Sequence, residues 1–134
     1  MPGYSGTPLP KKLGIKAGFH VRLVNAPADV SKELKSALAG CELVTDTKIA
    51  LDFAMVFTKS SAHLSKEFQK ITAHLAPAGM LWVSWPKKSS GVTTDLDENG
   101  VRNIGLAAGL VDVKVCAVTE VWSGLKFVRR LKDR

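Results

Sequence analysis

The sequence predicts an α/β domain in which helices cover both faces of a mainly parallel β-sheet and an antiparallel hairpin strand ends the chain. Its 134 residues are 46% hydrophobic and 23% charged, which is typical of one globular domain. Two nearly continuous apolar runs, residues 51–57 and 80–85, flank an amphipathic segment. Strands without polar alternation are expected where both faces of a parallel sheet are covered.

The first β-α-β unit follows a segment, residues 1–18, that is rich in Pro, Gly and Lys. We interpret that segment as an N-terminal arm and residues 19–134 as a single domain. Residues 20–25 are predicted to be a strand, and residues 41–44 a short second strand. Between them, Asp29 or Ser31 is expected to cap a helix that ends near Gly40. Its apolar face has i, i+4, i+7, i+8 spacing: Val30, Leu34, Ala37 and Leu38.

The central unit is the clearest part of the pattern. A strand is predicted at residues 51–57, a helix at 61–76 and a strand at 80–85. The apolar stripe of this helix consists of Leu64, Phe68, Ile71 and Leu75. Because two strands joined by one helix form a parallel crossover, this unit predicts neighbouring parallel strands.

The C-terminal third is predicted as a loop at 86–94, a weaker helix at 95–108 and two strands. Gly100 and Gly105 lower the helix propensity of residues 95–108. Valines alternate with other residues from position 111, so a strand is expected to reach about residue 121. A turn is expected at Ser123-Gly124, followed by an antiparallel strand at 125–131.

The charge balance favours anionic partners. The chain has 19 Lys and Arg against 12 Asp and Glu, a formal net charge of +7. The clusters are Lys11-Lys12, Lys87-Lys88 and a basic C-terminus with Arg129, Arg130, Lys132 and Arg134. That C-terminus suggests nucleic-acid binding as one alternative, although no standard nucleic-acid motif is present.

The sequence disfavours secreted, membrane-spanning, disulfide-rich and metal-binding proteins. The N-terminus has no apolar core of signal-peptide length and no stretch could span a membrane, so a cytoplasmic protein is expected. Cys41 and Cys116 are too few for a disulfide framework and are expected to be buried in strands. His63 and His74 are interpreted as a surface pair on one helix, and no metal site is predicted.

Three stretches resemble class I S-adenosylmethionine-dependent methyltransferases: residues 13–23, 75–83 and 107–113. The resemblance implies a three-layer Rossmann-like fold. In those enzymes a glycine-rich turn follows the first strand and lets the backbone approach the cofactor. Here that turn is Asn25-Ala26-Pro27-Ala28-Asp29, which lacks glycine and whose proline lacks an N–H donor. We therefore assign no catalytic residue, and S-adenosylmethionine is expected only under a methyltransferase alternative.

The chain also resembles, over nearly its whole length, a small bacterial family of unknown function. The matching stretches are residues 4–9, 12–16, 81–91, 109–116 and 122–126. This resemblance implies a bacterial origin and supplies no activity.

Two candidate sites follow from the predicted ends of the strands. The first is a basic loop that could bind an anion, made of Lys87, Lys88, Ser89, Ser90 and Gly91. The second is a crevice at the switch point of the sheet, lined by Asn25, Pro27, Thr58, Lys59 and Ser60. Trp85 and Trp122 are candidates for stacking on a base.

These observations favour a non-catalytic binding module for a phosphate-like or nucleotide-like ligand or for a protein partner. A divergent S-adenosylmethionine-dependent methyltransferase is the first alternative, and a basic nucleic-acid-binding protein is the second.

Overall fold

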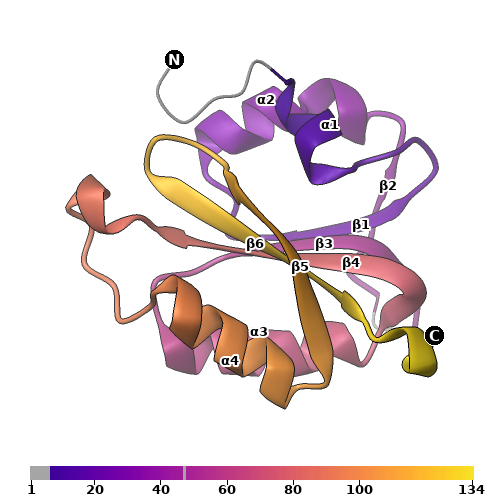
Figure 1. Ribbon diagram of the computed structural model, residues 1–134. Helices are drawn as coiled ribbons and strands as arrows, with labels where there is room; N and C mark the ends of the chain where they lie inside the picture. Colours follow the sequence, from indigo (N-terminus) through magenta and orange to yellow (C-terminus); the bar gives the residue numbers. More distant parts are fainter. Residues whose placement is uncertain (1–6, 47) are drawn as a thin grey trace.

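The computed structural model describes residues 7–46 and 48–134 and places a six-stranded sheet between two layers of helices (Figure 1). The strands are β1 His20–Val24, β2 Glu42–Leu43, β3 Leu51–Phe57, β4 Leu75–Pro86, β5 Leu110–Ala117 and β6 Trp122–Arg129. Helices α1 Leu9–Leu13 and α2 Ala28–Leu38 cover one face of the sheet, and α3 Ser61–Thr72 and α4 Glu98–Ala107 cover the other. The predicted three-layer α/β architecture is therefore confirmed.

The strand order is β2-β1-β3-β4-β6-β5. The first four of these strands run parallel, and β6 lies antiparallel between β4 and β5. From β1 the chain passes outward to β2 and then returns to β3 on the other side of β1. The carboxyl ends of β1 and β3 therefore form the switch point, which is where open α/β sheets bind ligands.

The core has two layers, one on each face of the sheet. The α1–α2 face buries Leu13, Val21, Leu34, Phe53 and Trp82. The α3–α4 face buries Leu64, Phe68, Ile71, Trp85 and Phe127. Because β3 and the middle of β4 are covered on both sides, their sequences are the continuous apolar runs that predicted them.

Part of the expected N-terminal arm belongs to this core. Residues 9–13 form α1, in which Leu9 and Leu13 are buried. The indole Nε1 of Trp82 donates a hydrogen bond of 2.9 Å to the carbonyl of Leu13, which ties this helix to the centre of the sheet. The interpretation of this stretch as a segment with little apolar surface is therefore wrong for these residues.

The C-terminal hairpin turns earlier than predicted. β5 ends at Ala117 and β6 begins at Trp122, so Ser123 and Gly124 lie within a strand and the predicted turn there is wrong. The Oγ1 of Thr119 accepts the N–H groups of Val121 and Trp122 at 3.1 Å, and these bonds hold the turn. The expected strands of the hairpin are otherwise present and antiparallel.

α3 ends at Thr72, four residues before its predicted end, and β4 already begins at Leu75. The guanidinium of Arg129 donates to the carbonyls of Thr72 and Leu75, each at 2.7 Å from Nη2. Carbonyls at the end of a helix lack partners within it, and the guanidinium from β6 supplies one to the carbonyl of Thr72. Arg129 therefore joins the end of α3 to the sheet.

The start of α2 differs from the expected capping. Its N-cap residue is Pro27, which makes no side-chain capping bond. Asp29 lies inside the helix and its Oδ1 accepts only the N–H of Val30, at 3.0 Å. The prediction that Asp29 or Ser31 caps the helix is therefore wrong.

α4 depends on the glycine that lowered its predicted propensity. A Cβ at Gly105 would overlap the ring of Phe127 on β6, so only glycine lets the helix lie this close to the sheet. The helix begins at Glu98, later than predicted, with Asp97 as its N-cap; the Asp97 Oδ1 accepts the N–H of Gly100 at 2.7 Å.

The helices of the described ranges are short. The longest, α3, has 12 residues, and none is long and apolar enough to cross a membrane.

Candidate ligand-binding crevice

A hollow of about 390 Å³ lies where β1 and β3 end. It is lined by Asn25, Phe57, Thr58, Lys59, Ser60, His63 and Trp122. The structure thus brings together four residues of the predicted crevice, Asn25 from the end of β1 and Thr58, Lys59 and Ser60 from the end of β3. Pro27 does not line the hollow; it is the N-cap residue of α2.

Asn25 follows β1 directly and has φ 57°, the only positive φ of a residue other than glycine among the described residues. Asparagine tolerates this left-handed conformation better than most residues with a Cβ. Its side chain is exposed at the rim of the crevice. The turn thereby presents an amide, with both donor and acceptor groups, where β1 ends.

The Thr58–Ser60 turn shapes the floor of the crevice. Ser60 is the N-cap of α3, and its Oγ accepts the N–H of His63 at 3.3 Å. Ser61 at the start of α3 donates its N–H and its hydroxyl to the carboxylate of Asp95, at 2.8 and 3.1 Å. Because Asp95 already occupies this helix terminus, an added anion would not be stabilised there.

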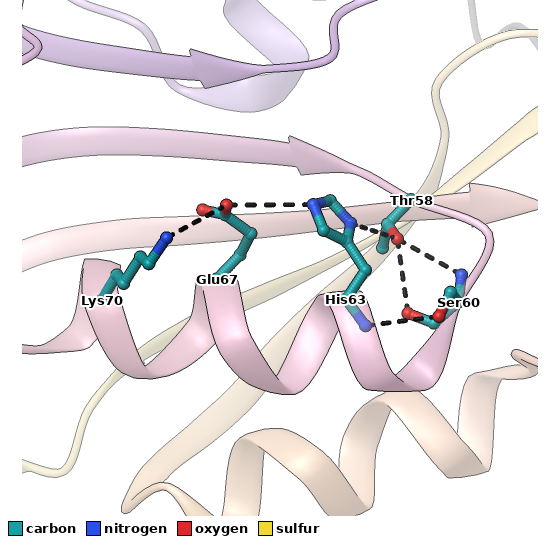
Figure 2. A network of polar contacts seen from close by, with 5 residues as sticks. All are labelled: Thr58, Ser60, His63, Glu67 and Lys70. Carbon is teal, nitrogen blue, oxygen red and sulfur yellow. Dashed lines mark hydrogen bonds and ion pairs between the residues drawn. The ribbon is translucent and has the colours of Figure 1, made fainter.

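His63 is the centre of a polar network that extends from this turn along α3 (Figure 2). Its Nδ1 lies 2.8 Å from the Oγ1 of Thr58, which is 5% exposed, and its Nε2 lies 3.8 Å from the Oε1 of Glu67. The Nζ of Lys70 lies 4.0 Å from the same Glu67 oxygen. An imidazole held between a hydroxyl and a carboxylate can hold or accept a proton at the crevice.

Sequence reasoning missed His63. The interpretation as a surface pair with His74 on one helix is wrong, because α3 ends at Thr72 and His63 lines the crevice. The signal that could have identified it is the i, i+4 spacing of His63 and Glu67, directly after a strand end that carries Thr58.

Phe57 and Trp122 form the apolar wall. Their rings meet edge to face, with centroids 5.2 Å apart and an interplanar angle of 82°. Trp122 is half-buried, so part of its ring can meet a ligand. Trp85 is 5% exposed and packs into the core on the α3–α4 face, which leaves little of its ring for stacking.

The predicted anion loop lines a different hollow from this crevice. Lys87 and Lys88 line another hollow, of about 360 Å³, together with Asp97 and Glu98. The Oγ of Ser90 donates to the carbonyl of Lys87 at 2.6 Å and so stabilises the loop. Residues 88–90 form a short 3-10 helix, η1 (Lys88–Ser90). That helix ends at Gly91, with φ 75°, and Ser89 is exposed within it. The nearby carboxylates weaken the positive potential that an anion site needs.

Arg22 on β1 was not predicted as a site residue. Its Nε donates to the carbonyl of Val44 at 3.3 Å, while its Nη2 is buried without a partner in the described structure. Arg22 lines a hollow of about 480 Å³ beside β1 and β2, and Asn25 lines both this hollow and the crevice. A guanidinium favours carboxylate and phosphate groups, so this neighbouring hollow adds a potential anion-binding group.

Metal ligation has no support within the described residues, where no group of three His, Cys, Asp or Glu side chains is placed to hold an ion. Cys41 and Cys116 are free thiols, and both are only partly buried, contrary to the expected burial. Burial raises the pKa of Cys116, although nearby Lys12, Lys114 and Lys87 oppose that shift.

The comparisons with known proteins agree with this architecture. A family model described as "Protein of unknown function (DUF3052)" matches residues 10–131. No curated protein matches the sequence significantly.

Solved methyltransferases share the fold. Magnesium protoporphyrin IX methyltransferase from Synechocystis PCC 6803, with bound SAH, has a TM-score of 0.60 at 11% identity, over 90% of this chain and 78% of that one. A precorrin-6y C5,15-methyltransferase from Geobacter metallireducens GS-15 gives 0.61 at 11%, over 91% and 86%. A SAM-dependent methyltransferase from Aquifex aeolicus gives 0.61 at 16%, over 87% and 85%. At these identities the likeness shows the fold alone.

Proposed function

This chain belongs to the DUF3052 family, and we propose that it is a binding domain for a nucleoside-type small molecule, held in the crevice where β1 and β3 end. The observation that carries the proposal is the composition of the crevice: an aromatic wall faces an amide, two hydroxyl groups and an imidazole. A few polar groups in an otherwise apolar hollow are characteristic of small-molecule sites.

Each part of a nucleoside has a counterpart among these residues. Trp122 supplies a surface on which a base can stack. The Asn25 amide can both donate to and accept from the edge of a base or from a ribose hydroxyl. The exposed Lys59 at the rim suits an anionic substituent. The volume, about 390 Å³, lies within the usual range of roughly 300–1,000 Å³ for ligand pockets.

The structural neighbours make S-adenosyl compounds the first ligands to test, because SAH is bound in one of them. The β1–α2 turn fits such a cofactor incompletely. It has no glycine, its Asn25 carries a Cβ at positive φ, and Pro27 offers no N–H. Binding of the nucleoside part is therefore better supported by this chain than methyl transfer.

A methyltransferase is the second candidate, favoured by one further observation. His63 lies in the same crevice and could take a proton from a substrate hydroxyl or amine. Under this candidate, wild-type protein supplied with S-adenosylmethionine and an extract of host metabolites forms S-adenosylhomocysteine, and His63→Gln forms much less. Equal amounts of product from His63→Gln and wild type would show that the imidazole takes no part in the reaction.

Isothermal titration calorimetry with S-adenosylhomocysteine and with adenosine tests the binding proposal. We expect both to bind, and Trp122→Ala to weaken binding about tenfold or more, since stacking on one base contributes about 1–3 kcal/mol. Trp122→Phe keeps a ring and should retain most of the affinity. Lys66→Ala changes an exposed lysine on α3 that does not line the crevice and should bind like wild type. No binding of either ligand, or full affinity in Trp122→Ala, would contradict the proposal.

A further inference from the structure

A second basic surface lies on the C-terminal hairpin, on strands β5 and β6. Lys114 on β5 and Lys126 on β6 are direct cross-strand partners, so their side chains leave the same face of the sheet. Cys116 pairs with Gly124, one same-face position further along these strands, and Lys12 of α1 lies next to it. We name Lys12, Lys114 and Lys126 the lysine cluster.

Hydrogen bonds fix where two of these ammonium groups lie. The Nζ of Lys114 donates to the carbonyl of Lys12 at 3.1 Å, and the Nζ of Lys12 donates to the carbonyl of Ala117 at 3.0 Å. This reciprocal pair ties α1 to β5. An ammonium has three N–H donors, so the carbonyl of Lys12 leaves donors of Lys114 for another acceptor.

Lys126 lies between strands rather than at an edge, and its environment disfavours its charge. It is half-buried, and its partner on the neighbouring strand β4 is the buried Trp82. Burial, and then the neighbouring charge of Lys114, lower the pKa of Lys126. Like charges directly opposite each other in a sheet are destabilising. In the described part of the chain, no carboxylate forms an ion pair with Lys114 or Lys126.

We propose that the lysine cluster is a binding site for the phosphate groups of a small molecule that carries a di- or triphosphate. Phosphate oxygens accept charge-assisted hydrogen bonds, and consecutive phosphate groups can reach ammonium groups that lie side by side on two strands. A bound polyanion would offset the repulsion between Lys114 and Lys126. It would also place negative charge beside Cys116, which several lysines surround.

The lysine cluster shares no lining residue with the proposed nucleoside crevice. Trp122, which lines the crevice, lies four residues from Lys126 on β6, a separation of roughly 13 Å along a strand. A negative result for the nucleoside crevice therefore does not exclude the phosphate site, and the converse also holds.

Calorimetric titration of the full chain with inorganic triphosphate at low ionic strength tests the site. We expect binding that weakens about tenfold or more in Lys126→Ala, because a charged partner is lost. Within the described residues the Lys126 side chain forms no hydrogen bond or ion pair, so this variant should fold. Lys66→Ala removes the same charge from α3 and should bind like wild type. Absence of binding, or equal losses in Lys126→Ala and Lys66→Ala, would overturn the proposal.

Cys116 offers a second readout at the site itself. In a Cys41→Ser background, Cys116 is the only thiol that iodoacetamide can alkylate. Saturating triphosphate should slow its alkylation severalfold, since a neighbouring anion disfavours the thiolate and covers the thiol. Equal alkylation rates with and without saturating triphosphate would place the bound anion elsewhere and overturn the assignment.

Discussion

The loops that follow β3 and β4 leave neighbouring parallel strands at the same end of the sheet, but they have different surroundings. After β3, Thr58 and Ser60 meet His63 and face the Phe57–Trp122 wall across a hollow. After β4, Lys87 and Lys88 line a second hollow together with Asp97 and Glu98 at the start of α4. The loop with the stronger charge in the sequence thus shares its hollow with two carboxylates. Whether a loop can bind a ligand therefore depends on which groups the fold places around it, and not only on the residues of the loop.

The largest expected difference between the two loops is in stability. Thr58→Val removes a buried hydroxyl that contacts the Nδ1 of His63 and accepts the N–H of Ser60. We expect a loss of about 2 kcal/mol, because both contacts are lost around a side chain that is only 5% exposed. Ser90→Ala in the other loop removes bonds at a less buried hydroxyl and should cost about 1 kcal/mol or less.

Urea unfolding followed by circular dichroism measures both variants. Equal losses of stability in Thr58→Val and Ser90→Ala would show that the two loops are held equally, contrary to this comparison.

Asn25 allows a test of the crevice rim with a matched pair of variants. Because its φ is 57°, Asn25→Ala places a less tolerant residue in the left-handed region and should destabilise the fold by about 1 kcal/mol. Asn25→Gly removes the same amide without that strain and should keep nearly wild-type stability. Both variants should bind adenosine more weakly than wild type. Thermal unfolding measures the effect on stability, and calorimetry measures the effect on adenosine affinity. Full adenosine affinity in Asn25→Gly would show that the amide does not contact the ligand.

The smallest effect is expected from the basic loop. Lys87→Glu/Lys88→Glu reverses two charges in a hollow that shares no lining residue with the crevice. The affinity for adenosine, an uncharged ligand, should change less than twofold. A change of tenfold or more in calorimetry would mean that the β4 loop takes part in the same site.

The sequence predicted those features whose signals are local. β3 was predicted at its observed bounds, because Leu51–Phe57 is apolar at every position except Asp52. The crevice residues of the β1 and β3 ends were predicted from topology alone, since parallel strands end at one edge.

Features that depend on distant residues were missed. α1 has five residues and only two buried leucines, too few for a recognisable period. Gly124 resembled a turn residue, whereas its strand position brings it against Trp82, where a Cβ would lie 3.2 Å from the ring. The place of His63 depends on how α3 packs, and the carboxylates that share a hollow with Lys87 come from the start of the next helix. None of these contacts is encoded in a short stretch of sequence.

The most direct test of the central claim is to map the nucleoside on the protein by NMR. Adenosine is titrated into isotope-labelled protein while the backbone amides and the tryptophan indoles are followed. We predict the largest shifts at Asn25, Thr58, Ser60 and the indole of Trp122, with little change at Ser89, Ser90 and Gly91. Shifts concentrated at residues 87–91, or no shifts at saturating adenosine, would contradict the assignment of the crevice after β3 as the ligand site.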